Sequence, residues 1–243
     1  ARSVAEMRNL LEAERDPASS AGCEEMIRTD HEAKFFYLAG EDWSWQKFSD
    51  QRWCYRDAEV EWKFPKPSLL GEYQYENAAM AVACLRRTHP EITQCQMAEG
   101  IRNAIWPGRL QPIEAGYWRQ FVKEDTMLLL DGAHNAHAGK QLVAFAKTLS
   151  EPPALVIAMK ADKDADSFIR QWQDHTKSIS FTTIPDENES IDPQRLQQIA
   201  SRYKIKSRIV DTVEEGLKYA ATDSDKVIIC GSLYLAGEVL KKN

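Results

Sequence analysis

The stretch LLLDGAHNAHAGK, residues 128–140, decides the fold, because it joins three consecutive leucines to a polar turn and then to a helix-forming segment. An apolar strand that runs through a short turn into a helix is the repeating unit of a parallel sheet. The stretch also looks like a phosphate-binding loop, G-x-x-x-x-G-K-[ST]. However, six residues instead of four separate Gly132 and Gly139, and Gln141 stands where the hydroxyl residue belongs. It is therefore not a phosphate-binding loop, and no other part of the 243 residues fits that motif.

The same strand–helix rhythm continues to the end of the chain. Apolar runs predict strands at 126–131, 153–159, 178–184, 207–211 and 225–230, and helical patterns follow at 137–149, 164–174, 192–204, 213–221 and 233–241. Two helix starts are marked by Asp192–Pro193 and by Thr212 with Glu215. These features predict an α/β domain, Rossmann-like, with a parallel sheet covered by helices on both faces.

The first part of the chain has a different pattern. Aromatic residues alternate from Phe35 to Phe64, which predicts a small antiparallel meander whose tryptophans pack on the sheet. Helices are expected at 73–88 and at 93–106, the second capped by Thr93 with Gln96. Because PGRLQP, residues 107–112, interrupts the helical pattern, we predict two domains, 1–112 and 113–243.

Composition excludes several classes of partner. The net charge of −6 gives no electrostatic attraction to nucleic acid or to an anionic membrane. The longest apolar run is too short to span a bilayer, and we expect no signal peptide. The five scattered cysteines form no C-x-x-C pair, which favours reduced thiols in the cytoplasm over disulfides or a zinc site.

Polar residues gather directly after the strand at 126–131. In open parallel sheets, ligands bind at the carboxyl edge, where the strand order switches. We expect Asp131 and His134 to project there from the rim of the sheet, beside helix N–H groups that favour anions. Alternatively, Asp131 caps the helix and His134 bonds to the backbone. Asp, His and Asn together at this edge favour a binding site.

Four motifs resemble one known family in their order and spacing. LLLDGAHNAHA, with WPGRLQ and GEYQYENAAMAVACL upstream and GSLYLAGEVL at the end, is similar to folylpolyglutamate synthase/dihydrofolate synthase, a family of ATP-dependent ligases related to the Mur ligases. The resemblance runs from about Leu69 to the C-terminus. Tyr73–Gln74 stands where the family commonly has His-Gln, and Ala136 where it has Pro.

The resemblance implies a particular domain organisation. The chain is expected to be the C-terminal portion of such an enzyme: the end of the Mur-ligase-type central ATP-binding domain (meander and helices), followed by the C-terminal domain. The family's phosphate loop, magnesium-binding residues and folate pocket belong to a segment that these 243 residues do not contain. We therefore expect the chain alone to be inactive.

Individual residues take roles from the same resemblance. It implies that Asn77, Arg109 and Asp131 contact ATP, and that His134 and Ser232 line the glutamate site. It assigns no catalytic residue and no metal ligand here, and the ligands of Mg²⁺ are expected mainly in the missing segment. Simpler alternatives are a solvent-facing Asn77, a linker salt bridge for Arg109 and an ordinary helix cap for Ser232. KADKDADSF, residues 160–168, also matches the family, although a charged loop that begins a helix accounts for it.

The implied function is the addition of L-glutamate to dihydropteroate, to folylpolyglutamate, or to both, through an acyl phosphate, as a step of folate biosynthesis. The expected partners are ATP, L-glutamate and the folate or dihydropteroate substrate, with no nucleic acid and no membrane, and the expected state is a cytoplasmic monomer. Two other interpretations stay open: a non-catalytic nucleotide- or amino-acid-binding module of the same fold, and a fragment of a cell-wall Mur ligase.

Overall fold

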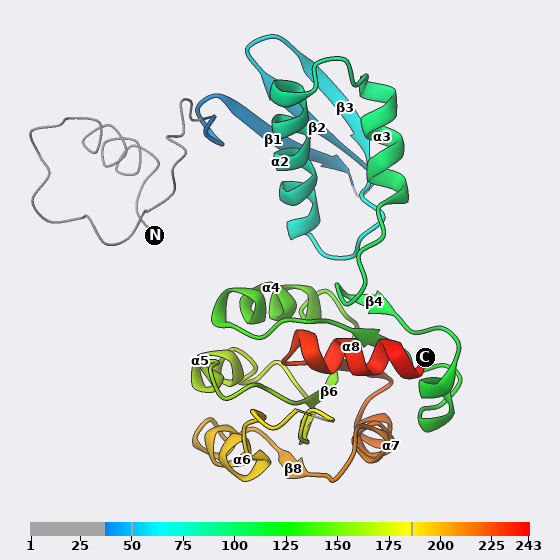
Figure 1. Ribbon diagram of the computed structural model, residues 1–243, viewed down its shortest axis with the longest axis vertical. Helices are drawn as coiled ribbons and strands as arrows, with labels where there is room; N and C mark the ends of the chain where they lie inside the picture. The colour runs from blue at the N-terminus through cyan, green and yellow to red at the C-terminus, as the bar shows by residue number, and fades with distance from the viewer. Residues whose placement is uncertain (1–36, 50, 186) are drawn as a thin grey trace, which may run out of the picture. The chain divides into compact units, whose positions relative to one another are not determined.

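The structure is a computed structural model, and it describes residues 37–49, 51–185 and 187–243. The chain divides into two compact units (Figure 1). The first unit comprises the chain up to Pro65 together with Ala79–Met97, and the second comprises Lys66–Ala78 together with Ala98–Asn243. The helices α2 (Tyr73–Thr88) and α3 (Gln94–Asn103) contribute residues to both units.

The first unit contains the predicted antiparallel meander. Its strands β1 (Trp43–Ser49), β2 (Arg52–Asp57) and β3 (Glu61–Pro65) pair in sequence order. Trp53 is fully buried, and its ring stacks on Phe64 at 4.9 Å between centroids, so the aromatic residues pack on the sheet as predicted. The meander begins later than we predicted, because residues 40–42 form a turn before β1; Phe35 lies outside the described residues.

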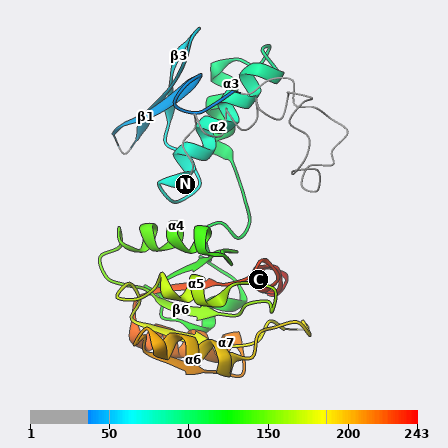
Figure 2. The same ribbon diagram turned by 90° about the vertical axis from the view of Figure 1, so that its left-hand side faces the viewer.

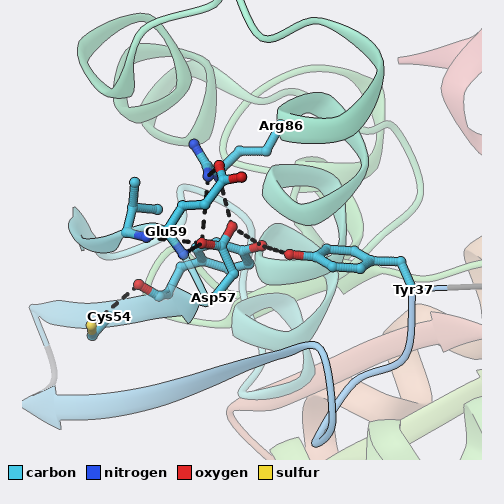
Figure 3. Close-up of polar contacts among 7 residues, drawn as sticks. Tyr37, Cys54, Asp57, Glu59 and Arg86 are labelled. Carbon is cyan, nitrogen blue, oxygen red and sulfur yellow. Dashed lines mark hydrogen bonds and ion pairs between the residues drawn. The ribbon is translucent and has the colours of Figure 1, made fainter.

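A partly buried polar cluster fixes the turn between β2 and β3 (Figure 3). The Asp57 carboxylate accepts hydrogen bonds from Arg86 Nε at 2.7 Å, from the Tyr55 hydroxyl at 3.1 Å, and from the N–H groups of Glu59 and Val60, both at 2.9 Å. Burial acts to raise the pKa of Asp57, but these hydrogen bonds prevail and lower it to about 2. Because Arg86 belongs to α2, the cluster ties the end of that helix to the sheet.

The helix starts agree with the sequence better than the helix ends do. The backbone N–H of Thr93 donates to Gln96 Oε1 at 2.9 Å, which confirms the predicted capping pair at the start of α3. This helix ends at Asn103 instead of the predicted Trp106. The proline at position 107 disfavours helical geometry in Trp106, and the structure has residues 104–106 outside the helix.

The second unit is built on a six-stranded sheet in the order β4-β5-β9-β6-β7-β8. Only β4 runs antiparallel, so the sheet is mostly parallel, as predicted. All five predicted strands are present, and β4 is an additional one. The strands are β4 (Gln111–Pro112), β5 (Met127–Leu130), β6 (Ala154–Ile157), β7 (Ser178–Phe181), β8 (Ser207–Ile209) and β9 (Lys226–Cys230).

Helices cover both faces of this sheet (Figures 1 and 2). One hydrophobic cluster joins the sheet to α4 (Ala136–Ala146), α5 (Ala165–Arg170) and α6 (Pro193–Arg202). A second cluster joins it to α7 (Val213–Asp223), α8 (Leu233–Lys242) and the short 3-10 helix η1 (Tyr117–Phe121). Neighbouring strand residues alternate between the clusters, as the pleat requires: Leu129 belongs to the first cluster, and Leu128 and Leu130 to the second.

Three further predictions concern the domain boundary, the cysteines and membrane-spanning helices. The division after Pro112 stays a prediction, although Gln111–Pro112 pairs, as β4, with β5 of the second unit. The four cysteines in the described part of the chain are all free. No helix within 37–49, 51–185 and 187–243 is both long enough and apolar enough to cross a membrane.

Candidate functional site

The strand order of the second unit switches at β9. The chain leaves β5 toward α4, on the face that contains Leu129 and Ile228. From β9, the neighbour of β5, it leaves toward α8, on the face that contains Leu130 and Ile229. Because adjacent parallel strands send their helices to opposite faces, the carboxyl ends of β5 and β9 flank the crevice where such sheets bind ligands.

Asp131 follows β5 directly but does not project from the rim. Only 4% of it is exposed, and its two carboxylate oxygens accept hydrogen bonds from the N–H groups of Leu110 at 2.8 Å and Ala133 at 2.7 Å. Our expectation of a rim position is therefore wrong. The helix-cap alternative is also wrong, because Asn135 is the N-cap of α4 and accepts from the N–H of Ala138 at 2.9 Å.

The two bonds to Asp131 join the turn after β5 to the loop that carries Arg109. Leu110 is fully buried and has φ of 44°, a left-handed conformation that is unfavourable for leucine. Gly108 has φ of 70°, and its carbonyl accepts from the N–H of Gly132 at 2.8 Å. These contacts fix the backbone on both sides of Arg109. A strained backbone held in this way is typical of functional loops.

Arg109 lies over the turn after β5. A Cβ atom at Gly132 would come within 3.3 Å of Arg109 Nη1 and within 2.3 Å of Leu233 Cδ2, so a side chain there would displace the end of Leu233 and crowd Arg109. Burial raises the pKa of Asp131, and the hydrogen bonds from Leu110 and Ala133 and the charges of Arg109 and His134 oppose this rise. The structure thus gathers one carboxylate, one guanidinium and one imidazole at the end of β5.

His134 and Ser232 each make a short hydrogen bond to the backbone next to their own strand end, β5 for His134 and β9 for Ser232. Nδ1 of His134 lies 2.8 Å from the carbonyl oxygen of Gly132, and since a carbonyl can only accept, we assign the proton to Nδ1. Ser232 is 3% exposed and is the N-cap of α8, where its hydroxyl accepts from the N–H of Tyr234 at 3.0 Å. The N–H of Gly231 donates to the carbonyl of Ala133 at 2.8 Å, which connects the two strand ends.

Tyr73 is a neighbour of the cluster that sequence reasoning missed. Burial first, and then the charge of Asp131, raise its pKa to about 12, while the charge of Arg109 acts in the opposite direction. Tyr73 belongs to the same compact unit as these two residues. Asn77 is four positions later in α2 and thus on the same side of the helix as Tyr73. The exposed Asn77 amide donates to Gln74 Oε1 at 2.9 Å.

Two cavities in this unit lie outside the cluster. One, of about 470 Å³, lies between the start of α5 and the helix α6 and includes Asp166 and Arg195 in its lining. The other, of about 210 Å³, is bounded by Tyr73, Gln141 and Phe145. Neither is lined by Arg109 or Asp131. The strand-order switch and the polar contacts, not these hollows, locate the candidate site.

Residues 114–242 match the family model described as "Dihydrofolate synthetase, C-terminal domain". The chain belongs to this family. The matched range contains Asp131, His134 and Ser232, whereas Asn77 and Arg109 lie before it.

Longer proteins resemble the chain beyond that range. The folylpolyglutamate synthase of Lacticaseibacillus casei is 26% identical over 196 residues, covering 78% of this chain and 42% of that protein. The dihydrofolate synthase/folylpolyglutamate synthase of Bacillus subtilis is 25% identical over 210 residues, covering 84% and 44%. The chain therefore spans less than half the length of these relatives.

Solved structures agree with the fold. The folylpolyglutamate synthase of Thermotoga maritima superposes with a TM-score of 0.65 at 25% identity, covering 84% of this chain and 47% of that one. FolC of Escherichia coli, solved in complex with DHPP and ADP, has a TM-score of 0.69 at 24% identity, covering 84% and 46%. These likenesses confirm the predicted α/β class with its mostly parallel sheet.

The dihydrofolate synthetase resemblance also implied magnesium. Within the described ranges, no group of three or more His, Cys, Asp or Glu residues could hold a metal ion. The carboxylate nearest the site, Asp131, already accepts two backbone N–H groups and is almost fully buried. The residues present therefore do not fit a metal site, and the chemistry below is derived from the protein's own groups.

Proposed function

We propose that the chain provides the C-terminal part of an ATP-dependent ligase that joins L-glutamate to dihydropteroate, to folylpolyglutamate, or to both, in folate biosynthesis. One observation carries the proposal: Asp131 fixes the strained loop that presents Arg109 at the strand-order switch, in a chain that belongs to the dihydrofolate synthetase family. The relatives that it matches are named as folylpolyglutamate and dihydrofolate synthases, which supports this substrate class.

The reaction has two steps in which the charges can be followed. A substrate carboxylate attacks the γ-phosphorus of ATP to form an acyl phosphate, and ADP leaves. The amino group of L-glutamate then attacks the acyl carbon, loses a proton and expels phosphate. Both steps place negative charge on phosphoryl oxygens, and the guanidinium of Arg109, carried on a loop whose backbone is fixed, stabilises that charge. Asp131 positions Arg109 through the N–H of Leu110, and Asn77 offers an exposed amide to the nucleotide.

The proposed glutamate-binding part of the site combines Ser232, which follows β9, with His134, in the turn after β5. The hydroxyl oxygen of Ser232 accepts from a backbone N–H, so its own proton is available to a carboxylate. With Nδ1 of His134 directed at a carbonyl, Nε2 is the ring nitrogen left for the incoming amino acid. The N–H groups at the start of α8 also favour an anion.

The proposed partners are small molecules, and we infer that the protein acts as a cytoplasmic monomer. The net charge of −6 supports the exclusion of nucleic acid and anionic membranes. The Escherichia coli protein that shares the fold was solved with ADP, which supports a nucleotide as one ligand of this chain.

Amide shifts of the isotopically labelled 243-residue chain during titration with ADP test the nucleotide site. We expect shifts at 108–110 and 131–134, and a loss of affinity of at least about tenfold for Arg109→Ala, because one charged contact is worth about 1.5–3 kcal/mol. Arg102→Ala, which changes an exposed arginine of α3, is the matched control. If ADP leaves these amides unchanged, or if Arg109→Ala binds it normally, the proposal fails.

A further inference from the structure

Lys160 is a partly buried lysine at the carboxyl edge of the same sheet. It follows β6, the strand on the other side of β9, and only 15% of its side chain is exposed. Its ammonium lies 4.3 Å from the centre of the Tyr234 ring, in the first turn of α8, two residues after Ser232. The proposed glutamate site and Lys160 thus share the end of β9.

Two carboxylates hold this lysine, and they differ in exposure. Lys160 Nζ lies 3.4 Å from Glu187 Oε2 and 3.0 Å from Glu189 Oε2. The Glu187 side chain is 19% exposed, whereas that of Glu189 is 71% exposed. The hydrogen bond to Glu189 raises the pKa of Lys160, against the effect of burial, so the ammonium is charged at neutral pH. An ion pair with so exposed a partner contributes little and exchanges easily.

The charges around Lys160 are unbalanced. Glu187 alone neutralises the lysine, so Glu189 adds one surplus negative charge. If a free carboxylate replaces that of Glu189, the net charge around the lysine stays the same, and the exchange costs little electrostatically.

The Glu189 side chain can leave without moving its loop. The carbonyl of Glu189 accepts from the N–H of Ala161 at 2.8 Å, and the N–H of Ile191 donates to the carbonyl of Met159 at 2.8 Å. These bonds involve backbone atoms only. They keep the loop beside β6 whichever way the Glu189 carboxylate points.

We propose that Lys160 is a specificity-determining residue that receives the side-chain carboxylate of the incoming L-glutamate, and that Glu189 occupies this position until the substrate arrives. The side-chain carboxylate of Glu189 is chemically the same group as the side-chain carboxylate of the L-glutamate substrate. The inference rests on the proposed function, since it assigns the selectivity of the same site. It implies that Lys160 distinguishes glutamate from glutamine, which lacks the side-chain charge.

Titration of the labelled chain with L-glutamate and L-glutamine, followed at the amides of 160–161, 187–190 and 233–234, tests this assignment. Lys160→Met keeps the apolar stem over Tyr234 and removes the charge. We expect it to weaken L-glutamate binding at least about tenfold, equal to about 1.4 kcal/mol, and to leave L-glutamine binding within twofold. Glu189→Gln removes the competing carboxylate, and we expect it to bind L-glutamate several-fold more tightly.

Matched controls come from the opposite edge of the sheet. Lys123 and Asp225 form an exposed ion pair at 3.3 Å before β5 and β9, so Lys123→Met and Asp225→Asn should leave both affinities unchanged. Because Glu189 is exposed, its variant tests the idea even if Lys160→Met does not fold.

Three results would overturn the inference: unchanged L-glutamate affinity in Glu189→Gln, equal losses for both amino acids in Lys160→Met, or no L-glutamate binding by either the unmodified chain or Glu189→Gln. An ADP titration of the same samples distinguishes a failure of the proposed role of Lys160 from a failure of the proposed function. If ADP binds through Arg109 while the L-glutamate response fails, only the role of Lys160 is lost.

Discussion

Replacing Asp131 by alanine removes the carboxylate that joins the turn after β5 to the loop of Arg109. The side chain accepts from the N–H of Leu110 at 2.8 Å and from that of Ala133 at 2.7 Å, and it is 4% exposed. Alanine cannot accept either bond. Both N–H groups would then be left in a buried region without their present partner.

The size of the effect follows from these two bonds. A buried donor left without a partner costs about 1–3 kcal/mol, so two of them cost roughly 2–6 kcal/mol. Burial raises the pKa of Asp131, which means that the charged carboxylate is itself unfavourable there, and its removal offsets part of the loss. We therefore expect Asp131→Ala to lower the free energy of unfolding by about 2–4 kcal/mol, or the melting temperature by roughly 5–15 °C.

Thermal unfolding followed by circular dichroism at neutral pH measures this loss. Asp192→Ala is the matched control, because Asp192 is an exposed N-cap whose carboxylate accepts from the N–H of Gln194 at 2.8 Å. Losing such a cap costs about 0.5–2 kcal/mol. A loss at position 131 no larger than the loss at position 192 would refute the structural role given to Asp131.

Three further predictions concern other parts of the chain. The pKa of Asp57 is lowered to about 2, from about 3.9 in an unfolded chain, so its contribution to stability is present above about pH 4 and is lost as the pH falls towards 2. The difference in unfolding free energy between the unmodified chain and Asp57→Asn, measured by urea unfolding, should therefore shrink between about pH 4 and about pH 2. A constant difference would contradict this prediction. The 243-residue chain alone should release no phosphate from ATP with L-glutamate and dihydropteroate or tetrahydrofolate, since it contains no phosphate-binding loop; enzymatic turnover would disprove this. Residues 113–243 should melt cooperatively by calorimetry. Residues 107–243 should melt at a higher temperature, because they add β4 and the buried Leu110. Equal melting temperatures would show that β4 and Leu110 do not stabilise the domain.

The elements that the sequence predicted are those with local signals. Continuous apolar runs identified the five parallel strands, and short-range capping identified helix starts: Asp192 caps α6, and Thr212 accepts from the N–H of Glu215 at 3.1 Å at the start of α7. Helix ends have weaker signals. The helix α5 ends at Arg170, before the predicted residue 174, and Asp174 has φ of 62°, outside helical geometry.

The features that the sequence did not predict depend on distant partners. The indole N–H of Trp118 donates to the carbonyl of Val239 at 2.7 Å, 121 residues away, and the two-residue strand β4 exists only through its pairing with β5. The candidate site follows the same rule. The strand end could be predicted, but the burial of Asp131 depends on an amide 21 residues earlier, which no local pattern contains.

The burial of Asp131 changes how variants of the site must be interpreted. A residue that touches the nucleotide and a residue that positions Arg109 both reduce activity when they are replaced, but only the second also releases the strained backbone at Leu110. Both carboxylate oxygens of Asp131 accept backbone N–H groups, so we propose that Asp131 influences a bound nucleotide by positioning the Arg109 loop. Loss of activity in Asp131→Ala therefore does not demonstrate contact with ATP. Arg109→Ala is the sharper test, because it removes the charge while the backbone bonds that shape the loop, from Leu110 to Asp131 and from Gly132 to Gly108, remain.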